Sequence, residues 1–334
     1  KSSRIEKSSL HDIWFNGSFV DIRKQHSTCD LYSSCKFCED ILYAGSYKSA
    51  LINKYEHYAF SKSQYPVIME FELSNKCNLA CIMCDSNLSS GIEAQNCDSV
   101  SGNQFYGDDF FEQLKEFIPH LQLAEFTGGD PFMIEEYYRV WDMIAELNPK
   151  CNILITTNAN TMNPKIEKLL ETHKNISFNI SIDSLEPDNY ESIRRNGNFE
   201  FAQKNIAKFI DYSRRNNTDV NFLVCPMTVN SHELANFVDY ANYSDICVYY
   251  HTVVKPKELS LKYLDSESLE KLADSIELRQ FPEDTKNQRT NRANLDNLIK
   301  LLRDWADENH QKENHKEKPD YLIQYAEAVD LLKI

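Results

Sequence analysis

The sequence predicts an α/β protein built on a parallel sheet. From residue 67 onward, short apolar runs alternate with amphipathic stretches, which gives about six βα repeats in succession. Such alternation makes the strands parallel, with right-handed crossovers. Polar, Gly-rich and Cys-rich segments follow the carboxyl ends of the predicted strands. Ligand sites lie at that end both in an open doubly wound sheet and in a partial barrel, so either architecture is expected.

The individual elements follow from the apolar pattern. Tyr137, Trp141 and Ile144 recur at helical spacing, and Pro164 suits a first helical turn. Strands are expected at residues 67–73, 121–126, 152–157, 176–182, 220–229 and 246–250. Helices are expected between them at residues 110–118, 134–147, 164–172, 199–213 and 232–241. After Pro256 the alternation stops, and helices are expected at residues 266–278, 294–309 and 321–332.

Composition excludes several classes of partner. The chain has 334 residues, and 51 Asp and Glu outnumber 36 Lys and Arg, for a net charge of −15. An acidic surface repels phosphate backbones, so nucleic acid is not expected as a partner. No apolar run reaches the roughly 18 residues of a membrane span, and the first residues have no apolar signal core. Because the chain starts at Lys1 rather than Met, we expect further residues upstream.

The spacing of the ten cysteines indicates whether they form disulfides or stay reduced. Six of them form two tight triplets, Cys29, Cys35, Cys38 and Cys77, Cys81, Cys84. Odd-numbered clusters favour metal ligation over disulfide pairing, which indicates a reducing cytoplasm. Of the four scattered cysteines, Cys151 and Cys247 begin apolar runs and are expected to be small buried hydrophobes.

The second triplet is the most informative motif. Cys77, Cys81 and Cys84 are spaced Cys-x3-Cys-x2-Cys directly after the first predicted strand. Three thiolates hold three irons of a four-iron cluster and leave the fourth iron open, whereas structural iron–sulfur and zinc sites take four ligands. The alternative is half of a zinc site that is completed elsewhere in the chain.

This loop resembles the signature of the radical S-adenosylmethionine (SAM) enzymes, and further matches follow in order. Thr127-Gly128-Gly129-Asp130-Pro131 is similar to the GGEP motif, whose backbone holds the SAM amino group. Thr156-Thr157-Asn158-Ala159 resembles the Thr-Asn-Gly segment near the ribose. Ser181, Asp183 and Arg194 lie in a region that resembles the one contacting the SAM ribose and carboxylate. Met83 stands where an aromatic residue is usual, Asp130 replaces Glu, and Ala159 replaces Gly.

The resemblance implies a partial (β/α)6 TIM-like barrel over about residues 63–255. It also implies a [4Fe–4S] cluster on Cys77, Cys81 and Cys84, with SAM bound by residues 128–130, Thr157, Asn158, Ser181, Asp183 and Arg194. The family transfers one electron into the sulfonium and cleaves it to methionine and a 5′-deoxyadenosyl radical. That radical takes a hydrogen atom from the substrate. A reduced flavodoxin or ferredoxin is the electron donor that the resemblance implies.

Residues 1–62 form a unit of different composition that carries the other triplet. Cys29, Cys35 and Cys38 look like part of the auxiliary-cluster extension called SPASM, or its shorter twitch form, here placed before the barrel. The candidates for the fourth ligand of this cluster are an upstream cysteine, Cys97 and His26. The remaining alternative is that the fourth position has no protein ligand. The alternative is a zinc site of three cysteines and His26. Residues 256–334 are expected to form a helical C-terminal extension.

The substrate is less well indicated than the cofactors. The resemblance implies either modification of a peptide, by crosslinking, epimerisation or oxidation, or dehydrogenation or epimerisation of a small metabolite such as an aminosugar. The alternative of another class is a non-catalytic iron–sulfur or zinc protein. Cys97 and Cys225 are candidate hydrogen-atom donors, with core packing as the alternative role for each.

Overall fold

A computed structural model describes residues 8–27, 55, 58, 64–96 and 106–314. Within these residues the chain forms one six-stranded sheet in which all strands are parallel and the order is β1-β2-β3-β4-β5-β6. The strands are β1 (Ile68–Phe71), β2 (Leu123–Phe126), β3 (Asn152–Thr157), β4 (Ile176–Ser181), β5 (Val220–Val224) and β6 (Cys247–Tyr250). Because the strands follow one another without a reversal of order, the sheet is a partial barrel rather than a doubly wound sheet.

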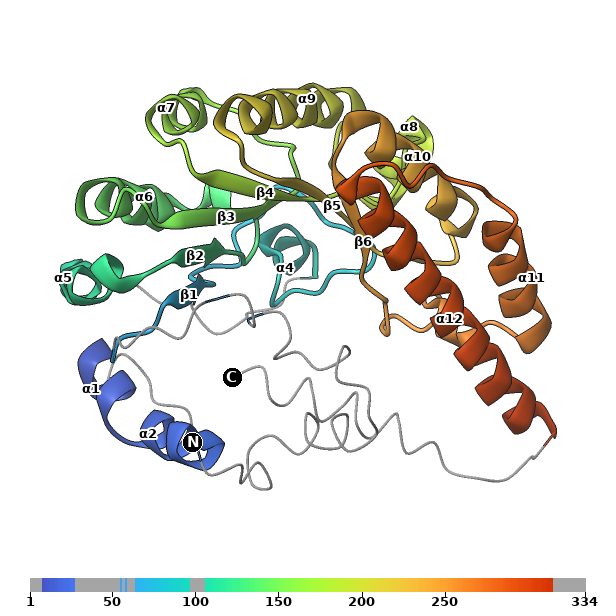
Figure 1. The fold of residues 1–334 in the computed structure, drawn as a ribbon, viewed down its shortest axis with the longest axis horizontal. Helices are drawn as coiled ribbons and strands as arrows, with labels where there is room; N and C mark the ends of the chain where they lie inside the picture. The colour runs from blue at the N-terminus through green and yellow to red at the C-terminus, as the bar shows by residue number, and fades with distance from the viewer. Residues whose placement is uncertain (1–7, 28–54, 56–57, 59–63, 97–105, 315–334) are drawn as a thin grey trace.

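The helices that follow the strands cover the outer face of this sheet (Figure 1). They are amphipathic and pack through aromatic side chains: the rings of Phe178 and Phe209 lie 4.5 Å apart, and Phe126 contacts Trp141 edge-on. Asn163 and Asn198 cap two of them by accepting backbone N–H groups. These helices are α5 (Asp108–Phe117), α6 (Glu135–Leu147), α7 (Pro164–Thr172), α9 (Phe199–Asn216) and α10 (Leu234–Ser244).

The inner face of the sheet is polar. Phe71 stacks on Phe126, which faces α6, so the alternating residues of the same strands point into the barrel. Glu70 and Glu125 are register partners on that inner face. By the same alternation the inner face carries Thr156, Asn179, Ser181 and Asn221, and the Asn221 amide donates to Asn179 at 3.1 Å. The concave side therefore carries carboxylates, amides and hydroxyls, with Leu154 and Leu223 as apolar residues among them.

Helices at the two ends of the chain cover the edges of the barrel. At the β1 side, α1 (Leu10–Phe15) packs against α5, and the Leu10 N–H donates to Gln113 at 2.6 Å, while α2 (Ser18–Ser27) packs against α1. At the β6 edge lies α12 (Lys286–Asn314), with α11 (Ser266–Glu277) packed against it. The buried Asn291 of α12 accepts from the Val248 N–H and donates to the Ile246 carbonyl. No helix among these residues is long and apolar enough to cross a membrane.

Most expected elements are confirmed within a few residues, and two are corrected. The expected strand at residues 220–229 ends at Val224, because Asn230 turns the following loop by binding the Met227 N–H and the Cys225 carbonyl. The helix expected at residues 294–309 begins at Lys286. The helix expected at residues 321–332 and the cysteines Cys29, Cys35, Cys38 and Cys97 lie outside the described residues. The unit boundaries at residues 62/63 and 255/256 stay predictions.

Candidate functional site: a cysteine loop at the carboxyl end of the barrel

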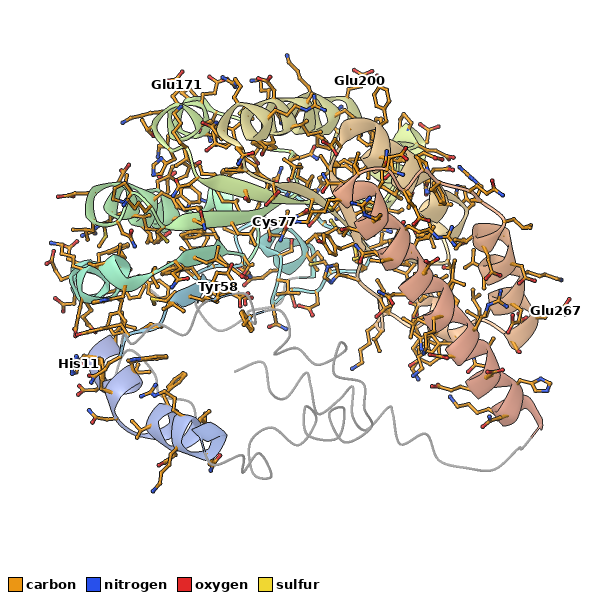
Figure 2. The ribbon with its side chains drawn as sticks, in the orientation of Figure 1. His11, Tyr58, Cys77, Glu171, Glu200 and Glu267 are labelled. Atoms are coloured by element: carbon orange, nitrogen blue, oxygen red, sulfur yellow. The ribbon has the colours of Figure 1, made fainter. Side chains whose placement is uncertain are left out.

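Cys77, Cys81 and Cys84 lie together in the loop that follows β1. Cys77 lies beside α4 (Ser90–Asn96), a helix on the concave side of the sheet (Figures 1 and 2). The three thiols are close enough for each charge to affect the others, and all three are free and partly buried. The three cysteines of the motif thus lie in one loop, with their sulfur atoms near enough to interact electrostatically.

The start of α4 holds the cysteine loop in place. The Ser89 hydroxyl donates to the Leu79 carbonyl at 2.6 Å, and the Ser90 hydroxyl accepts from the Cys77 N–H at 3.1 Å. The loop is also paired with the end of α8 (Pro187–Ile193), because the Ile82 N–H donates to the Ile193 carbonyl at 2.9 Å. The backbone around the sulfur atoms is therefore bonded on two sides.

Gly128 and Gly129 follow β2 and press against the cysteine loop. A Cβ atom on Gly129 would lie 2.2 Å from the Lys76 carbonyl oxygen. One on Gly128, whose φ is +108°, would lie 2.5 Å from the Ser74 carbonyl oxygen. The Gly129 N–H donates to Ser74 at 3.0 Å, and the Asp130 N–H donates to Lys76 at 2.8 Å. Both glycines are needed here for close backbone packing of two loops.

Asp130 joins the glycine loop to the loop after β3. Its side chain is fully buried, and Oδ2 accepts from the Thr157 hydroxyl and the Asn158 N–H, each at 2.8 Å. Burial raises the pKa of this carboxyl, although these hydrogen bonds oppose the shift. The Asn158 amide lies 3.7 Å from the Cys77 sulfur and donates to Asn78 at 2.9 Å. Of the predicted site residues, Gly129, Asp130 and Asn158 thus bond directly to the loop that carries the cysteines or to the residues leading into it.

Ala159 occupies the position where the family pattern has Gly. Its φ is +57°, in the left-handed region, and its side chain is fully buried. A residue with a Cβ atom is strained in that region, which explains why glycine suits this position. The Asn205 side chain donates to the Ala159 carbonyl at 2.8 Å and helps to hold this conformation.

Asp183 and Arg194 form a buried ion pair beside the cysteines. Arg194 Nη2 lies 2.7 Å from Asp183 Oδ2, and the side chains are 7% and 0% exposed. Arg194 Nη1 lies 3.9 Å from the Cys81 sulfur. Burial disfavours the guanidinium charge, but Asp183 and Cys81 outweigh it and raise the pKa of Arg194. The neighbouring Arg195 is exposed, so the structure selects Arg194 from the two adjacent arginines.

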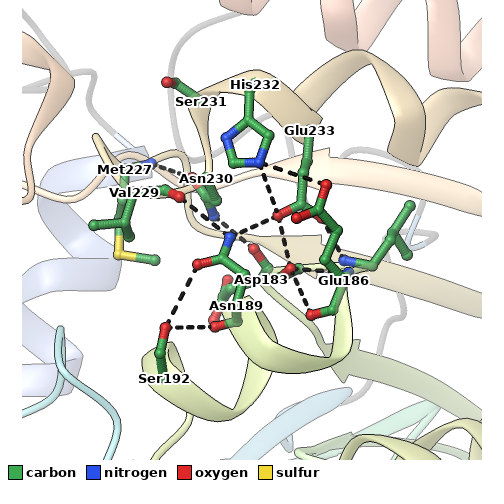
Figure 3. Close-up of polar contacts among 12 residues, drawn as sticks. Asp183, Glu186, Asn189, Ser192, Met227, Val229, Asn230, Ser231, His232 and Glu233 are labelled. Carbon is green, nitrogen blue, oxygen red and sulfur yellow. Dashed lines mark hydrogen bonds and ion pairs between the residues drawn. The ribbon is translucent and has the colours of Figure 1, made fainter.

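A second polar group holds the loop that carries Asp183 (Figure 3). Glu233 is fully buried and accepts from the Ser184 hydroxyl, the Leu185 N–H and the Asn189 amide, at 2.6–2.7 Å. Asn230 donates to the Asp183 carbonyl at 2.7 Å. Glu233 also meets His232 and Glu186 within 4.8 Å, but its oxygens already serve three donors, so it acts as a clamp for this loop.

Cys225 follows β5 and borders the same space. Its N–H donates to Asp183 Oδ1 at 2.7 Å, and its side chain packs near Ile82, Met83 and Ile193. Burial, with a further contribution from Asp183, raises the pKa of the Cys225 thiol. Met83, within the cysteine loop, packs against the same small apolar cluster. Ser181, the last residue of β4, is half-buried on the inner face.

The donor set fits a [4Fe–4S] cluster that is bound through three thiolates. Burial raises the pKa of Cys77, that of Cys81 to about 12 and that of Cys84 to about 11, so these thiols would become thiolates on binding iron. The Leu79 N–H donates to the Cys77 sulfur at 3.4 Å. Arg194 Nε has no hydrogen-bond partner among the described residues, although it is buried. Cys77, Cys81 and Cys84 would hold the cluster here.

Sequence reasoning misses the residues that orient this site. Asn230 and Glu233 lie in segments without a recognisable motif, and Asn78 and Asn160 lie within or beside motifs but are not among their characteristic residues. Only their hydrogen bonds assign them a role. Asn160 donates to the Tyr190 hydroxyl at 2.6 Å and accepts from the Asn198 N–H at 2.7 Å. None of these four residues directly follows a strand, so no local signal marks them in advance.

Comparisons with known proteins place the chain among a set of enzymes. It is 26% identical to a probable GTP 3′,8-cyclase of Methanococcus maripaludis over 227 residues, or 66% of this chain and 72% of the relative. A GTP 3′,8-cyclase of Clostridium botulinum is 26% identical over 141 residues, and the match spans 42% of each protein. SuiB of Streptococcus suis bound to S-adenosylmethionine matches with a TM-score of 0.47 and 16% identity, over 80% of this chain and 62% of SuiB.

The family comparison covers the part of the chain that contains the site. The model of the radical SAM superfamily matches residues 71–241. That range is 171 of 334 residues and runs from the end of β1 to α10. It includes the three cysteines of the loop and the other predicted SAM-site residues. The chain belongs to the radical SAM superfamily.

Proposed function

We propose that the chain binds a [4Fe–4S] cluster on Cys77, Cys81 and Cys84 and cleaves SAM reductively to start radical chemistry on a polar organic substrate. The observation that supports this most is that the loop of three partly buried thiols meets polar side chains from the loops after β3 and β4: Asn158 lies 3.7 Å from the Cys77 sulfur, and Arg194 lies 3.9 Å from the Cys81 sulfur. When bound, the cluster and SAM supply a 5′-deoxyadenosyl radical that abstracts a hydrogen atom from the substrate.

The residues of the chain position and enclose these groups. Gly128 and Gly129 let the loop after β2 lie directly against the cysteine loop, and the backbone of this glycine loop is the proposed contact of the SAM amino group. Thr157 and Asn158 are held by Asp130, and Ser181 and Asp183 lie at the end of β4. These residues are the proposed contacts of SAM. Arg194 supplies positive charge in a site from which water is largely excluded.

The inner face of the sheet supports a polar substrate that is neutral or cationic. None of the residues in β1–β6 is Lys or Arg, and Glu70 and Glu125 face each other across two neighbouring strands. Carboxylates attract an amine, while hydroxyls and amides bind sugar or peptide groups. A peptide and a small metabolite such as an aminosugar both meet this description, and both remain candidates.

GTP 3′,8-cyclisation is the second candidate, because several relatives carry that name. A nucleoside triphosphate needs cations around its phosphates. The carboxylates of Glu70 and Glu125 on the inner face oppose such binding. Incubation of reconstituted protein with SAM, dithionite and GTP tests this candidate. GTP-dependent formation of 5′-deoxyadenosine with consumption of GTP would establish it, and an unchanged rate would exclude it.

The N-terminal cysteines are part of the proposal. Cys29, Cys35 and Cys38, which lie outside the described residues, are proposed to bind an auxiliary iron–sulfur cluster, with a zinc site as the alternative. Iron analysis separates these cases: about eight irons per chain support two clusters, and about four support one. A flavodoxin or ferredoxin is the proposed electron donor.

A further inference from the structure

We propose that the ion pair of Asp183 and Arg194 sets the reduction potential of the cluster bound by the cysteine loop, acting through the sulfur of Cys81. This inference rests on the proposed function, because it needs the cluster to be present. It assigns Arg194 a role of its own toward the cluster, in addition to any contact with SAM.

The first argument is geometric. Arg194 directs its two terminal nitrogens in different directions: Nη1 lies 3.9 Å from the Cys81 sulfur, and Nη2 lies 2.7 Å from Asp183 Oδ2. Asp183 therefore binds one terminal nitrogen of the guanidinium, while the other terminal nitrogen lies near the sulfur. The backbone fixes both ends, since the Ile82 N–H donates to the Ile193 carbonyl and Asn230 donates to the Asp183 carbonyl.

The second argument is electrostatic. Both side chains are almost completely buried, at 7% and 0% exposed, so solvent screens their charges little. Reduction adds one electron to the cluster, and a fixed positive charge or an N–H donor next to a ligand sulfur stabilises that added charge. Arg194 therefore raises the potential, and the negative charge of Asp183 partly offsets this effect.

Replacement of Arg194 and replacement of Asp183 must then shift the reduction potential in opposite directions. Replacement of Arg194 by Gln removes the positive charge and is expected to make the cluster harder to reduce. Replacement of Asp183 by Asn leaves Arg194 without its counter-charge and is expected to make the cluster easier to reduce. A purely structural pair would behave differently, because breaking it from either side would disturb the same loop in the same way.

The test is a redox titration of anaerobically reconstituted protein, without SAM, in which the reduced cluster is followed by electron paramagnetic resonance. Arg194→Gln should lower the midpoint potential, Asp183→Asn should raise it, and Arg194→Lys, which keeps the charge, should lie closer to wild type. For a one-electron couple, a tenfold change in the reduction equilibrium corresponds to about 59 mV. The matched control is Arg195→Gln, since the neighbouring Arg195 is exposed and should leave the potential unchanged.

Two further measurements keep the outcomes separate. Iron content per chain shows whether each variant holds its cluster. A variant with Ala at Cys77, Cys81 and Cys84 identifies the paramagnetic resonance signals of any cluster that other cysteines bind. If Arg194→Gln loses the cluster, the midpoint potentials of Asp183→Asn and Arg194→Lys test the inference. Unchanged potentials in these variants, or a negative shift in Asp183→Asn, would overturn the inference. Absence of 5′-deoxyadenosine in wild-type protein would instead count against the proposed function.

Discussion

The carboxylate of Asp130 accepts a hydrogen bond from the backbone N–H of Asn158 at 2.8 Å, and this bond ties the loop after β2 to the loop after β3. The same oxygen accepts from the Thr157 hydroxyl. Asn158 in turn lies 3.7 Å from the Cys77 sulfur. A buried carboxylate therefore connects the glycine loop to the cysteine loop.

Asp130→Asn should weaken this connection. The substitution places an amide N–H₂ where one carboxylate oxygen accepts hydrogen bonds, and a buried unsatisfied group costs about 1–3 kcal/mol. We expect a loss of that size in the free energy of unfolding, measured by urea denaturation, and a lower iron content after reconstitution. The matched control is Asp142→Asn on the exposed side of α6, which should change neither. Full stability and iron content in Asp130→Asn would contradict the assigned role.

Gly129→Ala should displace the cysteine loop. The new Cβ atom would lie 2.2 Å from the Lys76 carbonyl oxygen, so one of the two backbones must move. We expect reconstituted protein with less iron and little formation of 5′-deoxyadenosine. Gly17→Ala is the control, because an added Cβ atom there meets no atom of the described residues within 4 Å, although the φ of Gly17, +62°, is positive. Equal iron content in Gly129→Ala and wild type would show that the glycine is not needed for close packing.

Cys225→Ala separates a hydrogen-atom donor from a packing residue. The raised pKa of Cys225 keeps its thiol protonated, as a hydrogen-atom donor must be. If Cys225 or Cys97 is that donor, its replacement by Ala should abolish turnover of substrate while 5′-deoxyadenosine still forms. Chromatographic assay of both products measures the difference. Turnover that continues in both variants would remove the thiols from the chemistry.

The buried thiol of Cys151 should make stability fall at high pH. Burial raises its pKa from an ordinary value of 9.0 to about 12, and the side chain is fully buried. A raised folded-state pKa contributes stability below pH 9 that is lost as the pH rises toward 12. At pH 10 this loss is about 1.4 kcal/mol. Cys151→Ala should be less stable than wild type at pH 8 by about 1 kcal/mol, and urea denaturation should find this difference gone at pH 10. A stability difference that persists at pH 10 would contradict a raised pKa of Cys151.

The sequence predicts the sheet and the cysteine loop well because both depend on local patterns. The six apolar runs correspond to six strands, and the spacing of Cys77, Cys81 and Cys84 is itself the motif. The first turns of α12 could not be predicted in this way. Residues 286–293 are almost entirely polar, and this part of the helix is held by the buried Asn291, which bonds to the backbone of β6 and its flanking residue.

The supporting residues of the site depend on tertiary contacts that leave no local pattern. Arg194 and Arg195 are equivalent in the sequence, and only the fold buries one beside Asp183 and exposes the other. Glu233 is an ordinary charged residue until the loop after β4 brings three donors to it. The predicted role of Gly129 also becomes more specific, because its missing side chain makes room for the Lys76 carbonyl.

Reductive cleavage of SAM by the reconstituted protein tests the central claim most directly. Wild-type protein, with its iron content determined, is incubated anaerobically with SAM and dithionite beside a variant with Ala at Cys77, Cys81 and Cys84. We predict 5′-deoxyadenosine from the wild-type protein and none from the variant. No 5′-deoxyadenosine from iron-loaded wild-type protein, or equal amounts from both proteins, would contradict the account.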